Sequence, residues 1–439
     1  MGALLLVDAT AATASPDLRD PHSGSPVTWE STVDSSRFGR SSANDGIRAL
    51  STAATTSTKR HTVQVVVATP KNIPKKRVKK WVRGTDVDRL LKKTSSYWSK
   101  QSRGKVKFVR SGKVRRINTG DGACRTTKQV LKQVKRGGKK HYGKGWYSSS
   151  TRGPDRRAHL VVLFPYRSGD YPGGSRYGKT CRGKVGLGSM PSKAGRNSPG
   201  GWTFSLFGGP NGQRSGQRWN HPQYEKGVAT LAHELAHNMG LEHSGVGWCR
   251  GKADGSFSSK RCGAAEGLDP LDLMGAEFAA DGVPSLSGAQ KRRLGVLPTS
   301  EQRYMSKKKG SRTVTLTARD RDTKRPTLVR ARDPRTGDVY FIELRRKESG
   351  VRYPYTRLPY RASSDYTVRY GVTVSRLAPK SSRWAYPGEH LVVPMGRESK
   401  RRSTMKQGQT FTSRSGHLKI KVVDVGKGKK NAKLRITFR

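Results

Sequence analysis

The chain has 439 residues, enough for two or three domains, and its 32% hydrophobic content allows a buried core. Its 88 Lys and Arg against 31 Asp and Glu leave a net charge of +57, which is spread along the sequence. This charge predicts non-specific, salt-sensitive attraction to anionic cell-envelope polymers. No helix-turn-helix, zinc-finger or RRM pattern occurs, so specific nucleic-acid recognition is not expected. No apolar run approaches the about 20 residues of a membrane span.

The first residues resemble the end of a secretory signal. Within 1–14, Ala12-Thr13-Ala14 has the small-x-small form of a cleavage site, although Asp8 interrupts the apolar core and no charged region precedes it. This segment is either a truncated signal peptide or an Ala-rich tail, and we expect a secreted protein. Residues 15–58 are rich in Ser, Thr, Ala, Asp and Gly, which predicts a disordered linker or a pro-segment.

Alternating strands and helices are predicted from residue 61 onward. The β-branched run His61–Ala68 is typical of a buried strand, and Thr85–Lys100 has the apolar spacing of a helix. His159 begins a strand and is expected to be structural rather than a metal ligand. The order expected is strand 61–68, helix 85–100, strands 106–109 and 114–117, helix 127–135 and strand 159–164. Two further pieces, 186–190 and 202–207, are strand-like within a Gly- and Ser-rich region.

The clearest pattern in the chain is H-E-x-x-H-x-x-G-x-x-H at 233–243. His233 and His237 are one helical turn apart, so both imidazoles can face one metal ion. Gly240 can adopt the positive φ that ends a helix, and the turn can bring His243 back as a third ligand. Three imidazoles leave a fourth position of tetrahedral zinc open to water, which is typical of a catalytic site. Glu234 then lies beside that water as a general base.

Coincidence is a poor explanation for this motif. A chain of this composition should contain the five-position pattern by chance on the order of 10⁻⁵ times. The surrounding residues also have a helical period, because apolar side chains recur three and four residues apart on one side. This stripe consists of Val228, Leu231, Ala232, Leu235, Ala236 and Met239.

The extended motif resembles the metzincin zinc metallopeptidases. Asp272-Leu-Met274-Gly275 resembles their methionine turn, and 269–275 followed by 287–295 is most similar to the gametolysin family. The resemblance implies a twisted mixed sheet with helices and an active-site helix, and Met274 packed beneath the histidines. Some metzincins have a tyrosine ligand two residues after the methionine; Ala276 stands there, so no fifth protein ligand is expected. No cysteine precedes Cys124, so a cysteine-switch propeptide is not expected.

The resemblance also implies a substrate-binding strand just before the active-site helix. An exposed strand edge can pair with an extended peptide through main-chain hydrogen bonds. Either 186–190 or 202–207 can be this strand, and the sequence does not choose between them. Asp269 and Asp272 have oxygen ligands for calcium, but they are too isolated to predict a calcium site.

Four cysteines, with no C-x-x-C, favour two disulfides in an exported chain over a zinc ribbon. Of three connectivities we favour Cys249–Cys262 with Cys124–Cys181; four free thiols in a cytosolic protein are the alternative.

After Pro298 the pattern changes to strands only. Six alternating segments predict an all-β, sandwich-like domain at 299–439 that follows a zinc metallopeptidase domain at 59–298. His390 and His417 are expected on strand surfaces. The predicted strands are 313–317, 339–344, 370–374, 390–393, 417–423 and 433–438.

The sequence therefore predicts an α+β protein that acts as a secreted zinc endopeptidase on proteins or peptides. Two alternatives remain. One is a zinc amidase that acts on cell-wall material. The other is a basic protein that binds polyanions or cell wall and has an inert metal site. The oligomeric state is not predicted.

Overall fold

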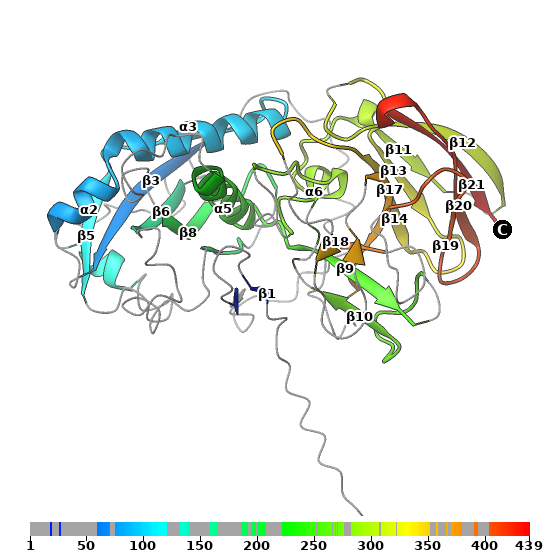
Figure 1. Ribbon diagram of the computed structural model, residues 1–439, viewed down its shortest axis with the longest axis horizontal. Coiled ribbons are helices and arrows are strands. Elements are labelled where there is room, and N and C mark those ends of the chain that lie inside the picture. Colours follow the sequence, from blue (N-terminus) through cyan, green and yellow to red (C-terminus); the bar gives the residue numbers. More distant parts are fainter. Residues whose placement is uncertain are drawn as a thin grey trace, which may run out of the picture.

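The computed structural model describes residues 18–19, 26–27, 59–70, 75–120, 132–137, 139, 158–165, 186–191, 195–198, 200–207, 222–250, 253–265, 267, 269, 271–275, 282–306, 309–321, 323–351, 357–358, 366–367, 370–379, 390–393 and 404–439. Within them the protein combines helices and sheets, in agreement with the general α+β class, and Figure 1 shows two lobes side by side. The predicted signal segment and most of 15–58 lie outside the described residues, apart from the short strands β1 (Leu18–Arg19) and β2 (Pro26–Val27).

A six-stranded sheet forms the centre of the N-terminal lobe. Its main order is β4-β3-β6-β8-β7, and β5 also pairs with β3. All neighbours are parallel except β7, which is antiparallel to β8 and lies at the edge. The sheet thus has the strands that the sequence predicts. They are β3 (Lys59–Pro70), β4 (Val106–Arg110), β5 (Arg115–Gly120), β6 (Ala158–Pro165), β7 (Gly186–Gly188) and β8 (Gly200–Phe207).

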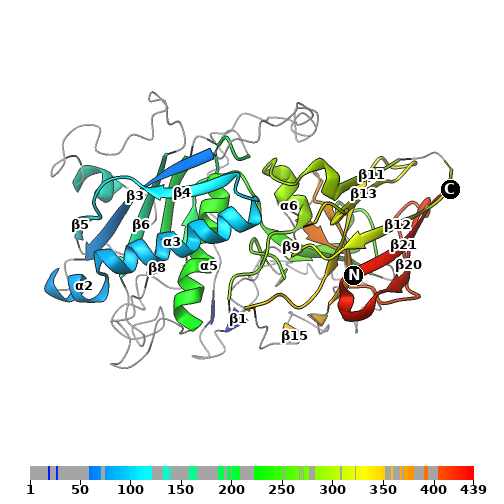
Figure 2. The ribbon, with the colours of Figure 1, turned by 90° about the horizontal axis from the view of Figure 1, so that it is seen from above.

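Three helices cover one face of this sheet. They are α2 (Lys75–Trp81), α3 (Gly84–Gln101) and α5 (Pro222–Asn238), of which α3 and α5 lie side by side in front of the sheet in Figure 2. The odd-numbered valines of β3 pack against these helices, because alternate residues of a strand face opposite sides. Val66 and Ala68 face the other side, where they pack with Val134 of the helical segment 132–137.

Two sheets form the C-terminal lobe and bury a common apolar core. A seven-stranded sheet has the order β10-β9-β18-β17-β14-β13-β11, and a four-stranded sheet has the order β12-β21-β20-β19. All six predicted segments are strands, and β11, β13 and β19 are additional. Those after residue 298 are β11 (Gln302–Met305), β12 (Gly310–Thr317), β13 (Leu328–Arg332), β14 (Val339–Arg345), β17 (Gly371–Leu377), β18 (His390–Val392), β19 (Thr410–Thr412), β20 (Leu418–Val425) and β21 (Asn431–Phe438), with the separate pair β15 (Arg357–Leu358) and β16 (Tyr366–Thr367).

The two remaining strands of the larger sheet come from before residue 298. β9 (Ser244–Cys249) begins directly after the histidine motif and pairs in parallel with β18, and β10 (Cys262–Ala265) pairs with β9. The predicted disulfide Cys249–Cys262 is present and joins β9 to β10. Cys124 and Cys181 lie outside the described residues. The segment that follows the motif is therefore built into the C-terminal lobe.

Buried ion pairs hold the lobes together. Arg345 of β14 pairs with Asp269 at 2.6 Å and with Glu343 at 2.7 Å, and all three side chains are buried. Arg319 pairs with Glu343 and Glu348, each at 3.1 Å. A buried charge is tolerated only when it is paired, so these contacts fix the 269–275 loop against the C-terminal sheet. No helix among the described residues is long and apolar enough to cross a membrane.

Candidate metal centre

Helix α5 places the first half of the motif. The predicted apolar stripe is fully formed, because Leu231, Leu235 and Met239 are completely buried in the core of the N-terminal lobe. His233 and His237 extend from another side of the same helix, one turn apart. Glu234 lies between them in sequence and is also buried. The helical period of 3.6 residues thus separates the packing face from the polar face.

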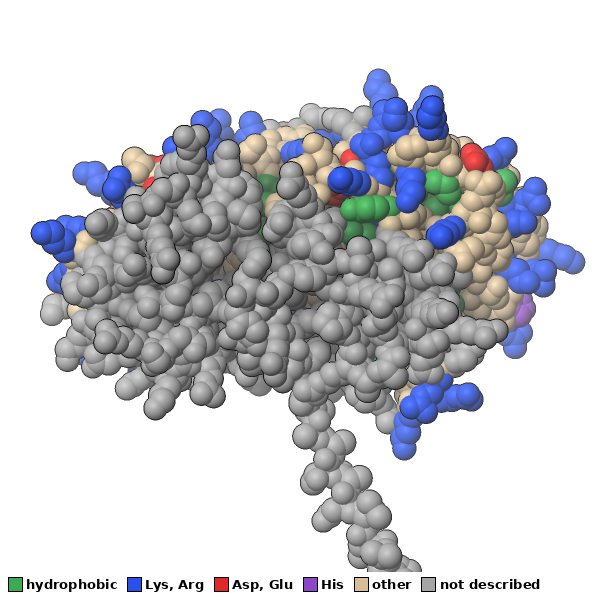
Figure 3. All heavy atoms as spheres, viewed as in Figure 1, with side chains coloured by type: hydrophobic (Ala, Val, Ile, Leu, Met, Phe, Trp, Pro, Cys, Tyr) green, Lys and Arg blue, Asp and Glu red, His purple; other side chains and the backbone are tan. Residues whose placement is uncertain are grey.

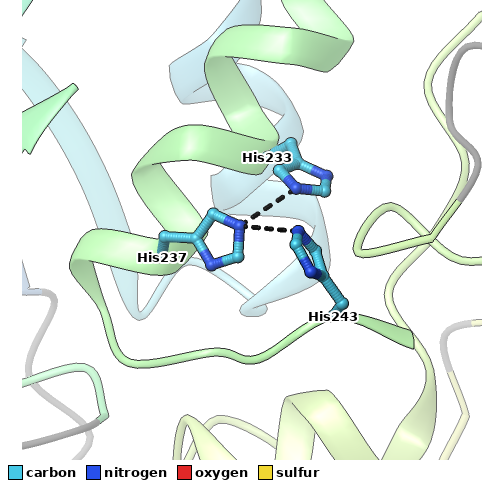
Figure 4. Close-up of side chains that lie close together, drawn as sticks. All are labelled: His233, His237 and His243. Atoms are coloured by element: carbon cyan, nitrogen blue, oxygen red, sulfur yellow. Dashed lines mark hydrogen bonds between the residues drawn. The ribbon is translucent and has the colours of Figure 1, made fainter. Parts of the chain in front are cut away.

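A glycine turn brings back the third histidine. Gly240 has φ +82°, a left-handed conformation that L side chains rarely adopt, and α5 ends just before it. The chain then returns so that Nε2 of His243 is 3.1 Å from Nε2 of His237 (Figure 4). Nε2 of His233 is also 3.1 Å from Nε2 of His237. Two nitrogens bound to one tetrahedral zinc at about 2.0–2.1 Å would lie about 3.3 Å apart, close to these distances.

Proton positions explain why these nitrogens can bind a cation. Nδ1 of His233 donates to the Leu273 carbonyl at 2.8 Å, and Nδ1 of His237 donates to the Leu241 carbonyl at 2.8 Å. A carbonyl only accepts, so these rings carry their protons on Nδ1 and, when neutral, hold a lone pair on Nε2. Burial, and then the neighbouring His243 and His233, keep the pKa of His237 well below its usual value.

The lone pairs of His233 and His237, whose Nε2 atoms are 3.1 Å apart, repel unless a cation lies between them. The buried group of His233, His237 and His243 can therefore hold a metal ion, and its ligand atoms all lie within 4.8 Å of one another. It is the one such group of three or more His, Cys, Asp or Glu found in the part of the chain that the structure describes. The Leu273 and Leu241 carbonyls orient two of the rings, as the hydrogen-bond partners of metal-binding histidines usually do.

Edge strand β7 lies against Glu234. A Cβ built on Gly186 would overlap Oε1 of the Glu234 carboxylate, and one built on Gly188 would be 2.8 Å from Cβ of His237. Position 188 therefore requires glycine, because its Cβ would also be 2.5 Å from the Glu234 carbonyl oxygen, and a side chain at 186 would displace the Glu234 carboxylate. Of the two candidate segments, 186–190 supplies the edge strand of this sheet, whereas 202–207 lies inside it as part of β8.

The loop 269–275 reaches the candidate centre through the Leu273 carbonyl, which accepts from Nδ1 of His233. The Asp272 carboxylate accepts from the backbone N–H of Met274 at 2.9 Å and of Ser287 at 3.0 Å. Met274 is completely buried in the same core as α5, and its carbonyl accepts from the N–H of Ser244 at 2.6 Å. The carboxylates of Asp269 and Asp272 are thus engaged in hydrogen bonds and an ion pair. Ala276 lies outside the described residues.

Asn238 is a site residue that sequence reasoning missed. Its Nδ2 donates to the carbonyls of Ser189 and Trp202, both at 2.9 Å, and so ties α5 to the β7–β8 edge. Its Oδ1 is 3.1 Å from Nδ1 of His159, which is buried and lies outside the three-histidine group. The structural role predicted for His159 agrees with these contacts. The one available signal was the position of Asn238, directly after a histidine of the motif.

The remaining histidines of the sequence analysis lie in the C-terminal lobe. His390 is in β18, and His417 is half-buried with its Nδ1 donating to the Ser415 carbonyl at 2.9 Å. His417 does not belong to the candidate metal centre.

No family model and no curated protein matches this chain. Among solved structures, the chain is similar to OgpA from Akkermansia muciniphila. The catalytically inactive protein in complex with an O-glycopeptide (glycodrosocin) substrate shares 11% identity, over 78% of this chain and 94% of that chain, with a TM-score of 0.31. A wild-type OgpA crystal structure shares 11% identity over 89% of this chain and 95% of that chain, with a TM-score of 0.29. Similarity at this level assigns no family, so the function must be argued from the site.

Proposed function

We propose that the protein is a secreted zinc endopeptidase of the metzincin type. The observation that carries this proposal is the convergence of three buried imidazole nitrogens beside a buried glutamate. The helix that carries two of them packs against β7, the last strand of its sheet among the described residues. The donor set favours zinc, because three neutral imidazoles suit zinc and hard cations such as calcium prefer oxygen.

Each residue then has a defined role. His233, His237 and His243 would hold the ion, which would supply a Lewis acid and a bound water with a pKa of about 7. Glu234, one residue from a ligand, would act as the general base that takes a proton from the attacking water and would pass it to the leaving amine. The Leu273 and Leu241 carbonyls keep two of the imidazoles in the orientation that exposes Nε2.

Strand β7 is the proposed substrate-binding edge. It is the last strand of its sheet among the described residues and packs directly against α5 at Glu234 and His237. An extended peptide that added to this edge would lie beside the three histidines, held by main-chain hydrogen bonds. Asn238 supports this edge because its amide holds Ser189 and Trp202 in place.

The direct test is cleavage of an unfolded protein by the purified chain. We expect cleavage that a zinc chelator abolishes and added zinc restores. Glu234→Gln keeps the size of the side chain and should retain zinc while hydrolysis falls by about 10²–10⁴-fold. Asp424→Asn removes an exposed carboxylate of β20 and serves as the control. Full activity of Glu234→Gln would exclude the proposed base. Cleavage of cell-wall amides in place of polypeptide would favour the amidase alternative.

A second, non-enzymatic role is supported by the four-stranded sheet. Lys421, Lys433 and Arg435 are exposed on its outer face, and Lys421 lies directly opposite Arg435. Figure 3 shows Lys and Arg side chains over the described surface of both lobes. We propose that this surface holds the protein near anionic cell-envelope polymers. Binding to such a polymer should weaken steeply with salt in both wild type and Glu234→Gln, whereas a salt-independent interaction would contradict this role.

Export remains part of the proposal. The Cys249–Cys262 disulfide supports it, because such bonds persist mainly outside a reducing cytosol. Residues 15–58 are proposed as a pro-segment, in which case their removal should raise the rate of cleavage. Equal activity with and without them would leave only the linker role.

A further inference from the structure

The third histidine is held differently from the first two. His233 and His237 are fixed by α5, whereas His243 lies in the irregular segment between α5 and β9. Leu241 is attached to the helix, because its N–H donates to the Ala236 carbonyl at 3.1 Å. Ser244 begins β9 and belongs to the C-terminal sheet, where it is the partner of His390 in β18. His243 therefore bridges the two lobes.

One side chain holds the chain on both sides of His243. Nε2 of Gln290 donates to the carbonyl of Glu242 at 2.8 Å and lies 3.2 Å from Oγ of Ser244. The Glu242 carbonyl only accepts, so the amide nitrogen of Gln290 must face it. Gln290 is itself buried, and its hydrogen bonds therefore form in a medium that strengthens them.

Gln290 is rigidly placed by its own helix. It lies on α6 (Gly288–Arg293), and its N–H donates to Oγ of the capping residue Ser287 at 3.2 Å. The N–H of Ser287 donates to Asp272 of the loop 269–275, and the N–H of Gly288 donates to Glu343 of β14 at 2.8 Å. The helix is thus fixed to both lobes, and Figure 1 shows α6 between them.

From these contacts we infer that Gln290 is a positioning residue for the third metal ligand. By holding residues 242 and 244 it limits where the His243 imidazole can lie relative to His233 and His237. A metal site loses affinity when one of three ligands is free to move, because ordering that ligand then costs conformational entropy on binding. This inference rests on the proposed metal site.

The test compares metal binding in four forms of the full-length protein: wild type, Gln290→Met, His243→Ala and Gln302→Met. Gln290→Met keeps the volume and removes both hydrogen bonds. Gln302 is the matched control, because its Nε2 also donates to backbone carbonyls, of Leu297 at 2.9 Å and Pro298 at 3.4 Å, but in the link to β11. We expect the zinc dissociation constant to rise about 10–100-fold in Gln290→Met and to stay at the wild-type value in Gln302→Met.

A spectroscopic readout separates positioning from loss of fold. With Co²⁺ in place of zinc, the visible absorption of Gln290→Met should shift toward that of His243→Ala, while the metal-free proteins unfold at similar temperatures. If Gln290→Met does not fold, Gln290→Glu keeps the shape and replaces the donor by a carboxylate, and the same loss of affinity is expected. Wild-type affinity and spectrum in a folded Gln290 variant would overturn the inference. A wild type that binds no zinc would instead exclude the proposed function.

Discussion

Two clusters of buried histidines meet the end of α5, and they differ in what their ring nitrogens face. In the pair His61 and His159, Nδ1 of His61 is 2.8 Å from Nε2 of His159, and the outer nitrogens face the Arg196 carbonyl and Asn238. In the candidate metal centre, Nε2 atoms converge on one another. Burial of histidines is therefore no mark of a metal site. The mark is a set of Nε2 atoms that converge, two of which hold lone pairs when neutral because their Nδ1 atoms donate to backbone carbonyls.

The largest effect on zinc binding and hydrolysis should follow from removing one of the three converging imidazoles. His237→Ala removes the ring whose Nε2 is 3.1 Å from both other Nε2 atoms. We expect loss of bound zinc. The rate of hydrolysis should fall by more than the roughly 100-fold that results when a residue hydrogen-bonded to a metal ligand is removed. The measurement is the zinc content after gel filtration, together with the rate of peptide cleavage. Stoichiometric zinc in this variant would contradict the assignment of His237 as a ligand.

Acid should destabilise the metal-free protein through the other cluster. Burial, partly opposed by the hydrogen bond with Asn238, lowers the pKa of His159 from 6.5 to about 4. Between these values the unfolded state binds the proton more readily, so the free energy of unfolding falls as pH decreases. The contribution of His159 to the free energy of unfolding is complete above about pH 6.5 and is lost by about pH 4. A shift of this size corresponds to about 3 kcal/mol.

This contribution can be isolated by chemical unfolding of the metal-free wild type and His159→Leu at several pH values. The difference in unfolding free energy between the two proteins should shrink from pH 6.5 to pH 4. A constant difference would show that His159 does not titrate in this window.

A smaller effect is expected from His159→Leu at neutral pH. The substitution removes buried hydrogen bonds to His61 and Asn238, which should cost about 1–3 kcal/mol of stability. Zinc affinity should change little, because His159 lies outside the converging group. Equilibrium unfolding and zinc titration check the two expectations separately. A loss of zinc as large as that of His237→Ala would remove the distinction between the clusters.

The smallest effect should come from a histidine in neither cluster. His417 is half-buried, and its side-chain contact is to Ser415 two residues away. His417→Gln should alter the free energy of unfolding by less than about 0.5 kcal/mol and leave zinc binding unchanged. A larger change in either quantity would show that histidine substitutions disturb this protein generally. The effects of His237→Ala and His159→Leu would then have to be measured relative to that of His417→Gln.

Local patterns predicted much of the fold. The apolar stripe of α5 and the β-branched run of β3 each depend on neighbours within a few residues, so both elements were predicted, and β3 extends two residues beyond each predicted end. Helix α2 was missed, because Lys75–Trp81 is mostly cationic and has few apolar residues to show a period. Strand β9 was missed because Ser244–Cys249 contains two glycines and one of its two partners, β18, is distant in sequence.

The sequence by itself determined which residues can form the candidate centre. The four-residue spacing of His233 and His237 and the glycine at 240 follow from helix geometry, which is local. Tertiary structure alone decided which segment is the edge strand, that His243 leads into the C-terminal sheet, and that Gln290 holds it there. Those contacts join residues far apart in the chain. They depend on how the strands pair and how the lobes pack, which no local spacing records.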